Sequence, residues 1–140
     1  MAHQLVILKV MKILLISIDP ILIDIVKTCA ENTKMELLFF NDSTDPLDIL
    51  SGVYSMHPAA LIIDDDYLNP NTSAILKSIK KVNQKVAIIF VTSNDSIELG
   101  REISNLGIQF YTLKPIAENE LKDLFESIPK LVNKHLGQTQ

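Results

Sequence analysis

Three side chains that could carry phosphoryl chemistry each follow a short apolar run in this chain of 140 residues. Asp64, Thr92 and Lys114 supply a carboxylate, a hydroxyl and an ammonium, in that order. A carboxylate can accept a phosphoryl group as a nucleophile, while an ammonium and a hydroxyl bind the phosphate oxygens. A divalent cation is usually needed as well, because the donor and the acceptor are both anionic. The sequence therefore predicts a site for a phosphoryl group on an aspartate, provided that the fold brings these residues together.

Five apolar runs, separated by segments with helical spacing, must provide the framework for this site. Most of the runs are apolar at every position, which is typical of strands buried on both faces of a parallel sheet. The runs cover residues 13–18, 37–40, 60–63, 86–91 and 108–113. The alternation predicts an α/β fold of three layers, (βα)5, with a doubly wound parallel sheet in strand order 2-1-3-4-5. Ligands of such sheets bind at the carboxyl ends of the strands.

The residues between the runs support this division. Asp19 and Asp45 each precede a proline, and an aspartate cap followed by proline is typical of the first turn of a helix. Gly107 stands where a left-handed residue would end the fourth helix. Pro129 should kink or restart the last helix.

Composition and charge exclude several classes of protein. The chain has 17 acidic and 13 basic residues, so it lacks the basic excess typical of domains that bind nucleic acid. Cys29 is the single cysteine, which leaves no intrachain disulfide and favours a reduced, cytoplasmic location. Lys9 and Lys12 interrupt the apolar N-terminal stretch, so we expect no membrane span. We expect residues 1–10 to be an N-terminal extension, 11–136 the domain and 137–140 a polar tail.

With these motifs in place, residues 11–132 resemble the receiver domain of two-component response regulators, a flavodoxin-like fold. Thr92 follows Asp64 by 28 residues and Lys114 follows Thr92 by 22, and both intervals suit that family. The resemblance implies that Asp64 is the phosphoacceptor, Thr92 the switch hydroxyl and Tyr111 the aromatic switch residue. Lys114 and Pro115 match the family's lysine-proline pair, whose peptide bond is typically cis.

The sequence departs from the family at the metal site and in the loop after the third run. The family places two adjacent acids after its first strand, where they hold magnesium, but this chain has Ser17 and Ile18. We expect Ile18 to fill the space of the second acid. A count from Pro70 would instead make Asp66 the acceptor, although the other intervals favour Asp64.

Few oxygen ligands therefore remain for Mg²⁺, which prefers hard oxygens in octahedral geometry. They are Asp64, the backbone carbonyl of Asp66, and Asp19 or Asp65. We expect magnesium binding to be weak or absent.

The resemblance implies a stand-alone signalling domain rather than an enzyme. It would take phosphate on Asp64 from a histidine kinase or a phosphotransfer protein and act through a downstream protein partner. A homodimer through the face of the fourth helix, fifth strand and fifth helix is a further expectation.

Two alternatives stay open at this point. In the first, the chain is a pseudo-receiver, a protein-interaction module that keeps the fold without phosphorylation. In the second, the Asp64-x-Asp66 motif belongs to a haloacid-dehalogenase-type phosphatase, although that family carries the motif on its first strand rather than its third.

Overall fold

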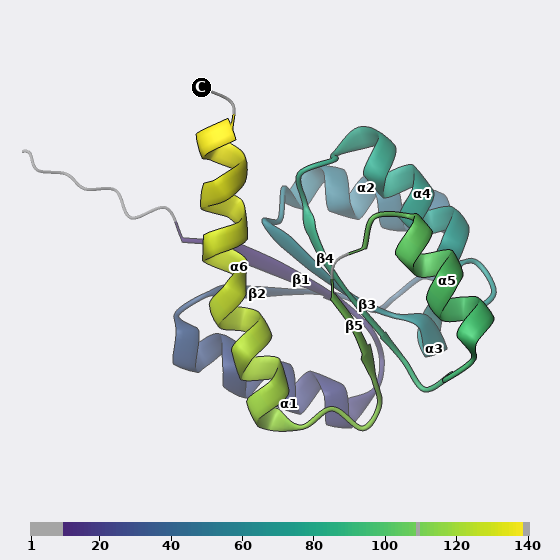
Figure 1. Ribbon diagram of the computed structural model, residues 1–140, viewed down its shortest axis with the longest axis horizontal. Coiled ribbons are helices and arrows are strands. Elements are labelled where there is room, and N and C mark those ends of the chain that lie inside the picture. Colours follow the sequence, from purple (N-terminus) through teal and green to yellow (C-terminus); the bar gives the residue numbers. More distant parts are fainter. Residues whose placement is uncertain (1–9, 109, 139–140) are drawn as a thin grey trace, which may run out of the picture.

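Five parallel strands form one sheet, and helices cover both of its faces (Figure 1). This computed structural model describes residues 10–108 and 110–138. The strand order is β2-β1-β3-β4-β5, and each neighbouring pair is parallel. The predicted fold class and strand order are thus confirmed. Residues 1–9 of the predicted extension and residues 139–140 of the predicted tail lie outside the described residues.

The elements alternate along the chain as predicted, with one addition. The strands are β1 (Lys12–Ile16), β2 (Glu36–Phe40), β3 (Ala60–Asp64), β4 (Ala87–Thr92) and β5 (Phe110–Leu113). The helices are α1 (Pro20–Thr33), α2 (Pro46–Met56), α3 (Asp65–Leu68), α4 (Thr72–Val82), α5 (Ile97–Asn105) and α6 (Glu118–Gln138). The addition is α3, a single turn directly after β3, which the apolar pattern did not predict. Its four residues are too few to show helical periodicity.

Two apolar clusters fill the space on the two sides of the sheet. Helices α1 and α6 cover one face, and α2, α4 and α5 cover the other (Figure 1). Along β1, Ile13 and Leu15 belong to the cluster under α1 and α6, whereas Leu14 and Ile16 belong to the cluster on the opposite face. All four side chains are completely buried. Because successive strand residues point to opposite faces, burial on both faces requires an unbroken apolar run.

The helix ends follow from the residues that precede or end them. The Asp19 carboxylate accepts hydrogen bonds from the first turn of α1, and Asp45 does the same for α2. Gly107 has a φ of 78° just after α5, a conformation that costs glycine little. Helix α6 runs through Pro129 to Gln138, so it does not restart at the proline.

The buried side of α6 offers a test of the packing. Phe125 is completely buried in the cluster under α1 and α6, and Phe125→Ala should lower the free energy of unfolding by about 3–5 kcal/mol. Phe39 on β2 is 37% exposed, so the matched control Phe39→Ala should cost about 1 kcal/mol. Urea denaturation of both variants measures the difference. Equal losses would contradict the placement of α6.

Candidate functional site

The three predicted chemical side chains lie at one edge of the sheet. Asp64 is the last residue of β3, Thr92 is the last residue of β4, and Lys114 directly follows β5. These strands are parallel neighbours, so their carboxyl ends meet at the same edge. Asp64 is 1% exposed and Thr92 is fully buried.

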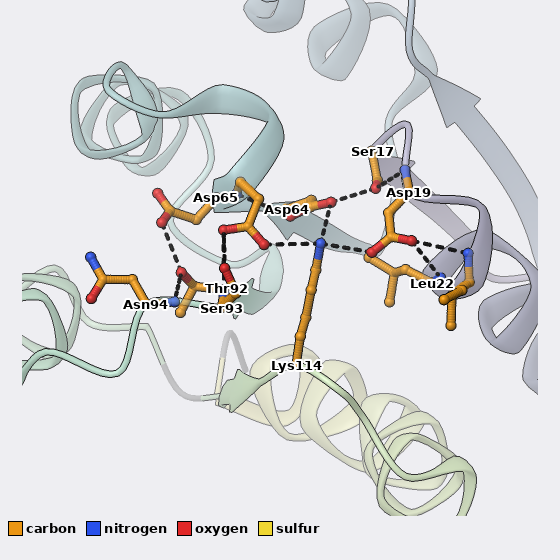
Figure 2. Close-up of polar contacts among 11 residues, drawn as sticks. Ser17, Asp19, Leu22, Asp64, Asp65, Thr92, Ser93, Asn94 and Lys114 are labelled. Atoms are coloured by element: carbon orange, nitrogen blue, oxygen red, sulfur yellow. Dashed lines mark hydrogen bonds and ion pairs between the residues drawn. The ribbon is translucent and has the colours of Figure 1, made fainter.

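The Asp64 carboxylate is bound by three donors (Figure 2). Its Oδ2 atom accepts from Ser17 Oγ at 2.6 Å and from Lys114 Nζ at 2.9 Å. Its Oδ1 atom accepts from the backbone N–H of Asp66 at 3.0 Å. The register pairs Ile16, the last residue of β1, with Ile63, so the residues that follow them, Ser17 and Asp64, also lie side by side. The position of the serine hydroxyl thus follows from the pairing of β1 with β3.

The ammonium of Lys114 lies among three carboxylates (Figure 2). The distances from Nζ are 2.9 Å to Asp19 Oδ2, 2.9 Å to Asp64 Oδ2 and 3.1 Å to Asp66 Oδ2. A lysine ammonium has three N–H donors, and one acceptor from each aspartate uses all of them. The three acids come from the β1–α1 loop, the end of β3 and α3, so one cation joins three segments.

The pKa values of this cluster reflect the shared ammonium. Burial would lower the pKa of Lys114, but hydrogen bonds to Asp19, Asp64 and Asp66 outweigh it and raise that pKa. The bond from Lys114 is the main cause that lowers the pKa of Asp19. Burial would raise the pKa of Asp66, but bonds from Ser93 and Lys114 outweigh it and lower that pKa. All of these shifts favour the charged forms, so the cluster is stable as ion pairs at neutral pH.

Thr92 belongs to a second polar cluster rather than to that of Asp64. Its Oγ1 atom donates to Asp65 Oδ2 at 2.9 Å and accepts from the backbone N–H of Asn94 at 3.0 Å (Figure 2). The alternation of side chains along a strand explains why Thr92 and Asp64 are separated. Asp64 is two residues after Ile62 and points to the same face of the sheet, and Thr92 is two residues after Phe90 and points to the same face as Phe90. Ile62 and Phe90 lie in the clusters on opposite faces of the sheet. The expected approach of Thr92 to Asp64 is therefore replaced by a bond to Asp65.

Tyr111 and Pro115 complete the set of predicted site residues. The Tyr111 ring stacks on that of Phe90 with 5.2 Å between centroids, and its hydroxyl donates to the Asn94 carbonyl at 3.4 Å. Tyr111 is 36% exposed, at the edge strand. The Lys114–Pro115 peptide bond is cis, as the resemblance implies. Its role and that of Tyr111 stay predictions.

The two residues that stand where the family has its acidic pair differ in burial. Ile18 is 58% exposed, and its place in the space of the second acid stays a prediction. It follows the last residues of β1 into a surface loop, where the chain turns toward the Asp19 cap of α1. Ser17, in contrast, is completely buried and bonded to Asp64. Its position in the sequence directly after a buried strand was the signal that could have identified this contact.

The three acids around Lys114 do not fit a magnesium site in this arrangement. Among residues 10–108 and 110–138, no group of three or more histidine, cysteine, aspartate or glutamate side chains is arranged to hold a metal ion. One oxygen of each candidate acid, Asp19, Asp64 and Asp66, is bonded to the ammonium instead. Ser17 donates a hydrogen bond to Asp64 and offers no anionic oxygen to a metal ion.

Comparison with known proteins finds likeness in structure only. The chain matches no family model and no curated protein. It superposes on a CheY-like response regulator receiver domain from Methanospirillum hungatei with a TM-score of 0.75, at 18% identity, over 90% of this chain and 99% of that one. A response regulator receiver domain protein from Clostridium thermocellum superposes with a TM-score of 0.70 at 23% identity, over 90% of this chain and 97% of that one. Chemotaxis protein CheY4 of Vibrio cholerae superposes with a TM-score of 0.70 at 15% identity, over 86% of this chain and 99% of that one.

The chain has the receiver fold. In these three comparisons the match covers 97% or more of the other chain, so the similarity extends over a complete domain. Within the described part of the chain, no helix combines the length and the apolar character needed to span a membrane. Asp64 and Lys114 lie together at the carboxyl edge of this receiver fold, and Ser17 takes the position beside them.

Removal of the shared ammonium tests its importance to this receiver fold. Lys114→Met leaves three neighbouring carboxylates without a cation. We expect it to lower the free energy of unfolding by about 2 kcal/mol at pH 7. This loss is smaller than that for a fully buried ion pair, because the cluster is partly exposed. Lys77→Met on α4, at an exposed position, is the matched control and should be near neutral.

The effect of Lys114→Met on the free energy of unfolding should depend on pH. The pKa values of Asp19 and Asp66 are lowered by folding, so the folded wild-type protein binds fewer protons than the unfolded chain in acid. The stability that these two carboxylates contribute is present above the unfolded carboxyl pKa of about 4, and it is lost as the pH falls through their lower pKa values in the folded protein. The difference in unfolding free energy between wild type and Lys114→Met should therefore shrink from pH 7 towards pH 3. Urea denaturation across this range measures it, and a constant difference would contradict the ion-pair account.

Proposed function

We propose that this chain is a receiver-type module of signal transduction that acts by binding protein partners and does not depend on phosphorylation of Asp64. The observation that carries the proposal is the state of the Asp64 carboxylate. It is 1% exposed, and Ser17, Lys114 and the Asp66 N–H already bind its two oxygens.

The chemistry of phosphate acceptance explains why this state matters. An Asp64 oxygen would have to attack phosphorus, form a new O–P bond and expel the leaving group of the donor. Hydrogen-bond donors on both oxygens draw electron density away from the attacking atom and make it a weaker nucleophile. The acids that would bring a cation to the donor are replaced by Ser17 and Ile18, and Lys114 neutralises the carboxylates in its place.

A second candidate function is phosphorylation of Asp64 by a histidine kinase or a phosphotransfer protein. Lys114 Nζ lies 2.9 Å from Asp64 at the carboxyl edge of the sheet, where it could follow the charge onto a phosphoryl group. Magnesium binding, the kinase, the downstream partner and a cytoplasmic location stay predictions under this reading. Phosphorylation is the second candidate because the contacts of Asp64 oppose its attack on phosphorus.

The third candidate, a haloacid-dehalogenase-type phosphatase, gains no support from Asp66. A general acid of that type needs a raised pKa so that it carries a proton near neutral pH. The pKa of Asp66 is lowered instead, since bonds from Ser93 and Lys114 outweigh the effect of burial. Asp66 is accordingly a carboxylate bound to a cation rather than a proton donor.

Reaction with a small phosphodonor separates the first two candidates. The natural chain, incubated with acetyl phosphate and MgCl2, should show no phosphoryl adduct by intact mass spectrometry. The double variant Ser17→Asp/Ile18→Asp restores the two acids after β1 and should gain both magnesium affinity and an adduct. The reason is that two additional carboxylates can bring a divalent cation to the acceptor.

Asp64→Asn controls for the site of modification in both backgrounds. It should remove the adduct from the double variant, because an amide oxygen does not form the acyl phosphate. Rapid modification of the natural chain, abolished by Asp64→Asn, would overturn the proposal and establish the second candidate. This result needs only the natural chain and its Asp64→Asn variant, so it stands even where the double variant folds poorly.

We predict that two copies of the chain associate through the face formed by α5, β5 and α6. Its exposed charged residues are Glu98, Arg101 and Glu102 on α5 and Glu120, Lys122 and Asp123 on α6. Both signs occur on both helices, so two copies related by a two-fold axis could pair opposite charges. Sedimentation velocity at low salt should show a dimer that Arg101→Glu weakens, whereas Lys77→Glu on α4 should not. A monomer at high protein concentration would contradict it.

A further inference from the structure

A polar cavity lies on the opposite side of the β3 end from Lys114. Its volume is about 190 Å³, and it opens between the α3–α4 connection, the start of α4 and α5. Its polar lining consists of Asp65, Asn69, Thr72, Ser73, Asn94 and Glu102. The interaction of Asp64 with Lys114 uses none of these side chains.

Two hydroxyls in this lining have no partner among the described residues. Thr72 Oγ1 and Ser73 Oγ are both buried, and neither makes a hydrogen bond there. Thr72 is 3% exposed, so the bulk solvent does not reach it freely. Buried polar atoms in proteins nearly always have a partner, because leaving them unsatisfied is unfavourable. Both residues line the cavity, so a ligand bound there could supply the missing partners.

The charge of the cavity decides the sign of this ligand. Asp65 is 4% exposed, and its carboxylate accepts one hydrogen bond, from Thr92 at 2.9 Å. No lysine, arginine or histidine forms an ion pair with it within the part of the chain that the structure describes. Glu102 adds a second carboxylate at the exposed side of the cavity. An anion would be repelled by both acids, whereas a cation would be attracted.

The electrostatic environment of Tyr111 agrees with this charge. Burial is the main cause that raises the pKa of its hydroxyl, and the negative charges of Asp65 and Asp95 raise it further. The groups facing Asp65 from the neighbouring elements are neutral or acidic: the Thr92 and Asn94 side chains from the end of β4, and Glu102 from α5.

We propose that this cavity binds a divalent metal cation that keeps part of its water shell, with Asp65, Thr72 and Ser73 as its buried ligands or water acceptors. The lining offers carboxylate, hydroxyl and amide oxygens, the hard donors that magnesium prefers. Magnesium is commonly held by one or two carboxylates plus waters, as this lining allows.

The proposed site is separate from the Lys114 cluster. Asp64 and Asp65 are adjacent in sequence but bind different groups, Lys114 on one side and Thr92 on the other (Figure 2). The ammonium repels a metal ion from the first cluster, whereas no described cation opposes it at the second. Through Asp65, the bound ion would also hold Thr92, whose hydroxyl contacts the N–H of Asn94.

A titration of the full chain with MgCl2, followed by ¹H–¹⁵N NMR at constant ionic strength, tests the proposal. We expect saturable shifts of the amide signals of Asp65, Thr72, Ser73 and Asn94. Thr72→Val keeps the shape but removes a ligand oxygen and should weaken binding about 10-fold, and Asp65→Asn should weaken it by about 100-fold.

Thr28→Val is the matched control, since the Thr28 hydroxyl is on α1 and donates to the Asp24 carbonyl. It should leave magnesium binding unchanged. Saturable shifts confined to residues around Asp19, Asp64 and Lys114 would overturn the proposal, and so would equal shifts with NaCl. An absence of saturable shifts would mean that the cavity holds water only. Unchanged affinity of Thr72→Val would exclude its hydroxyl from the site and overturn the ligand set.

Discussion

The ammonium of Lys114 holds together the edge of the sheet at which all the candidate chemistry lies. It bonds to Asp19, Asp64 and Asp66, which come from three separate segments. Two unit charges about 4 Å apart interact by about 4 kcal/mol at an effective dielectric constant of 20, so three carboxylates without a cation would repel one another appreciably. The geometry of the β1–α1 loop and of α3 therefore depends on this single cation. A metal ion would have to displace it to bind the same oxygens.

The pleat of β3 and β4 divides the polar residues of this edge into two clusters. Asp64 points to the face covered by α1 and α6, where Ser17 and Lys114 bind it. Asp65 bonds to Thr92 near the start of α5 instead. Neighbouring carboxylates thus have different partners: the first is neutralised by an ammonium, and the second accepts a neutral hydroxyl. This difference makes the second cluster the more open to a cation.

The fold was predictable because its strands are buried on both faces. The apolar runs had to be strands of a parallel sheet, and the aspartate-proline pairs marked the starts of α1 and α2, so class, order and most boundaries followed. The pairing of Asp64 with Lys114 was also predictable, since both follow neighbouring strands. The single-turn helix α3 was not, because four residues carry no periodic signal.

The direction of side chains at the strand ends was harder to predict than their position. Spacing placed Thr92 near Asp64, but the alternation of β4 directs its hydroxyl to Asp65. Ile18 belongs to the first apolar run, yet β1 ends at Ile16 and Ile18 lies 58% exposed in the loop. A run of apolar residues in the sequence can therefore extend beyond the buried part of a strand. Strand register, which sets where pairing stops, depends on neighbours far away in the sequence.

The two clusters together limit how this receiver fold could switch. In the switch that the resemblance implies, a lysine and a hydroxyl turn towards new charge on the aspartate. Here every N–H of Lys114 is already bonded to a carboxylate, and Thr92 is bonded to Asp65. Hydrogen bonds to charged groups contribute about 1.5–3 kcal/mol each, so new bonds to a phosphoryl group would replace existing bonds of similar strength. The free-energy difference between the unmodified and modified conformations is thereby reduced, which favours a domain that presents one conformation to its partners.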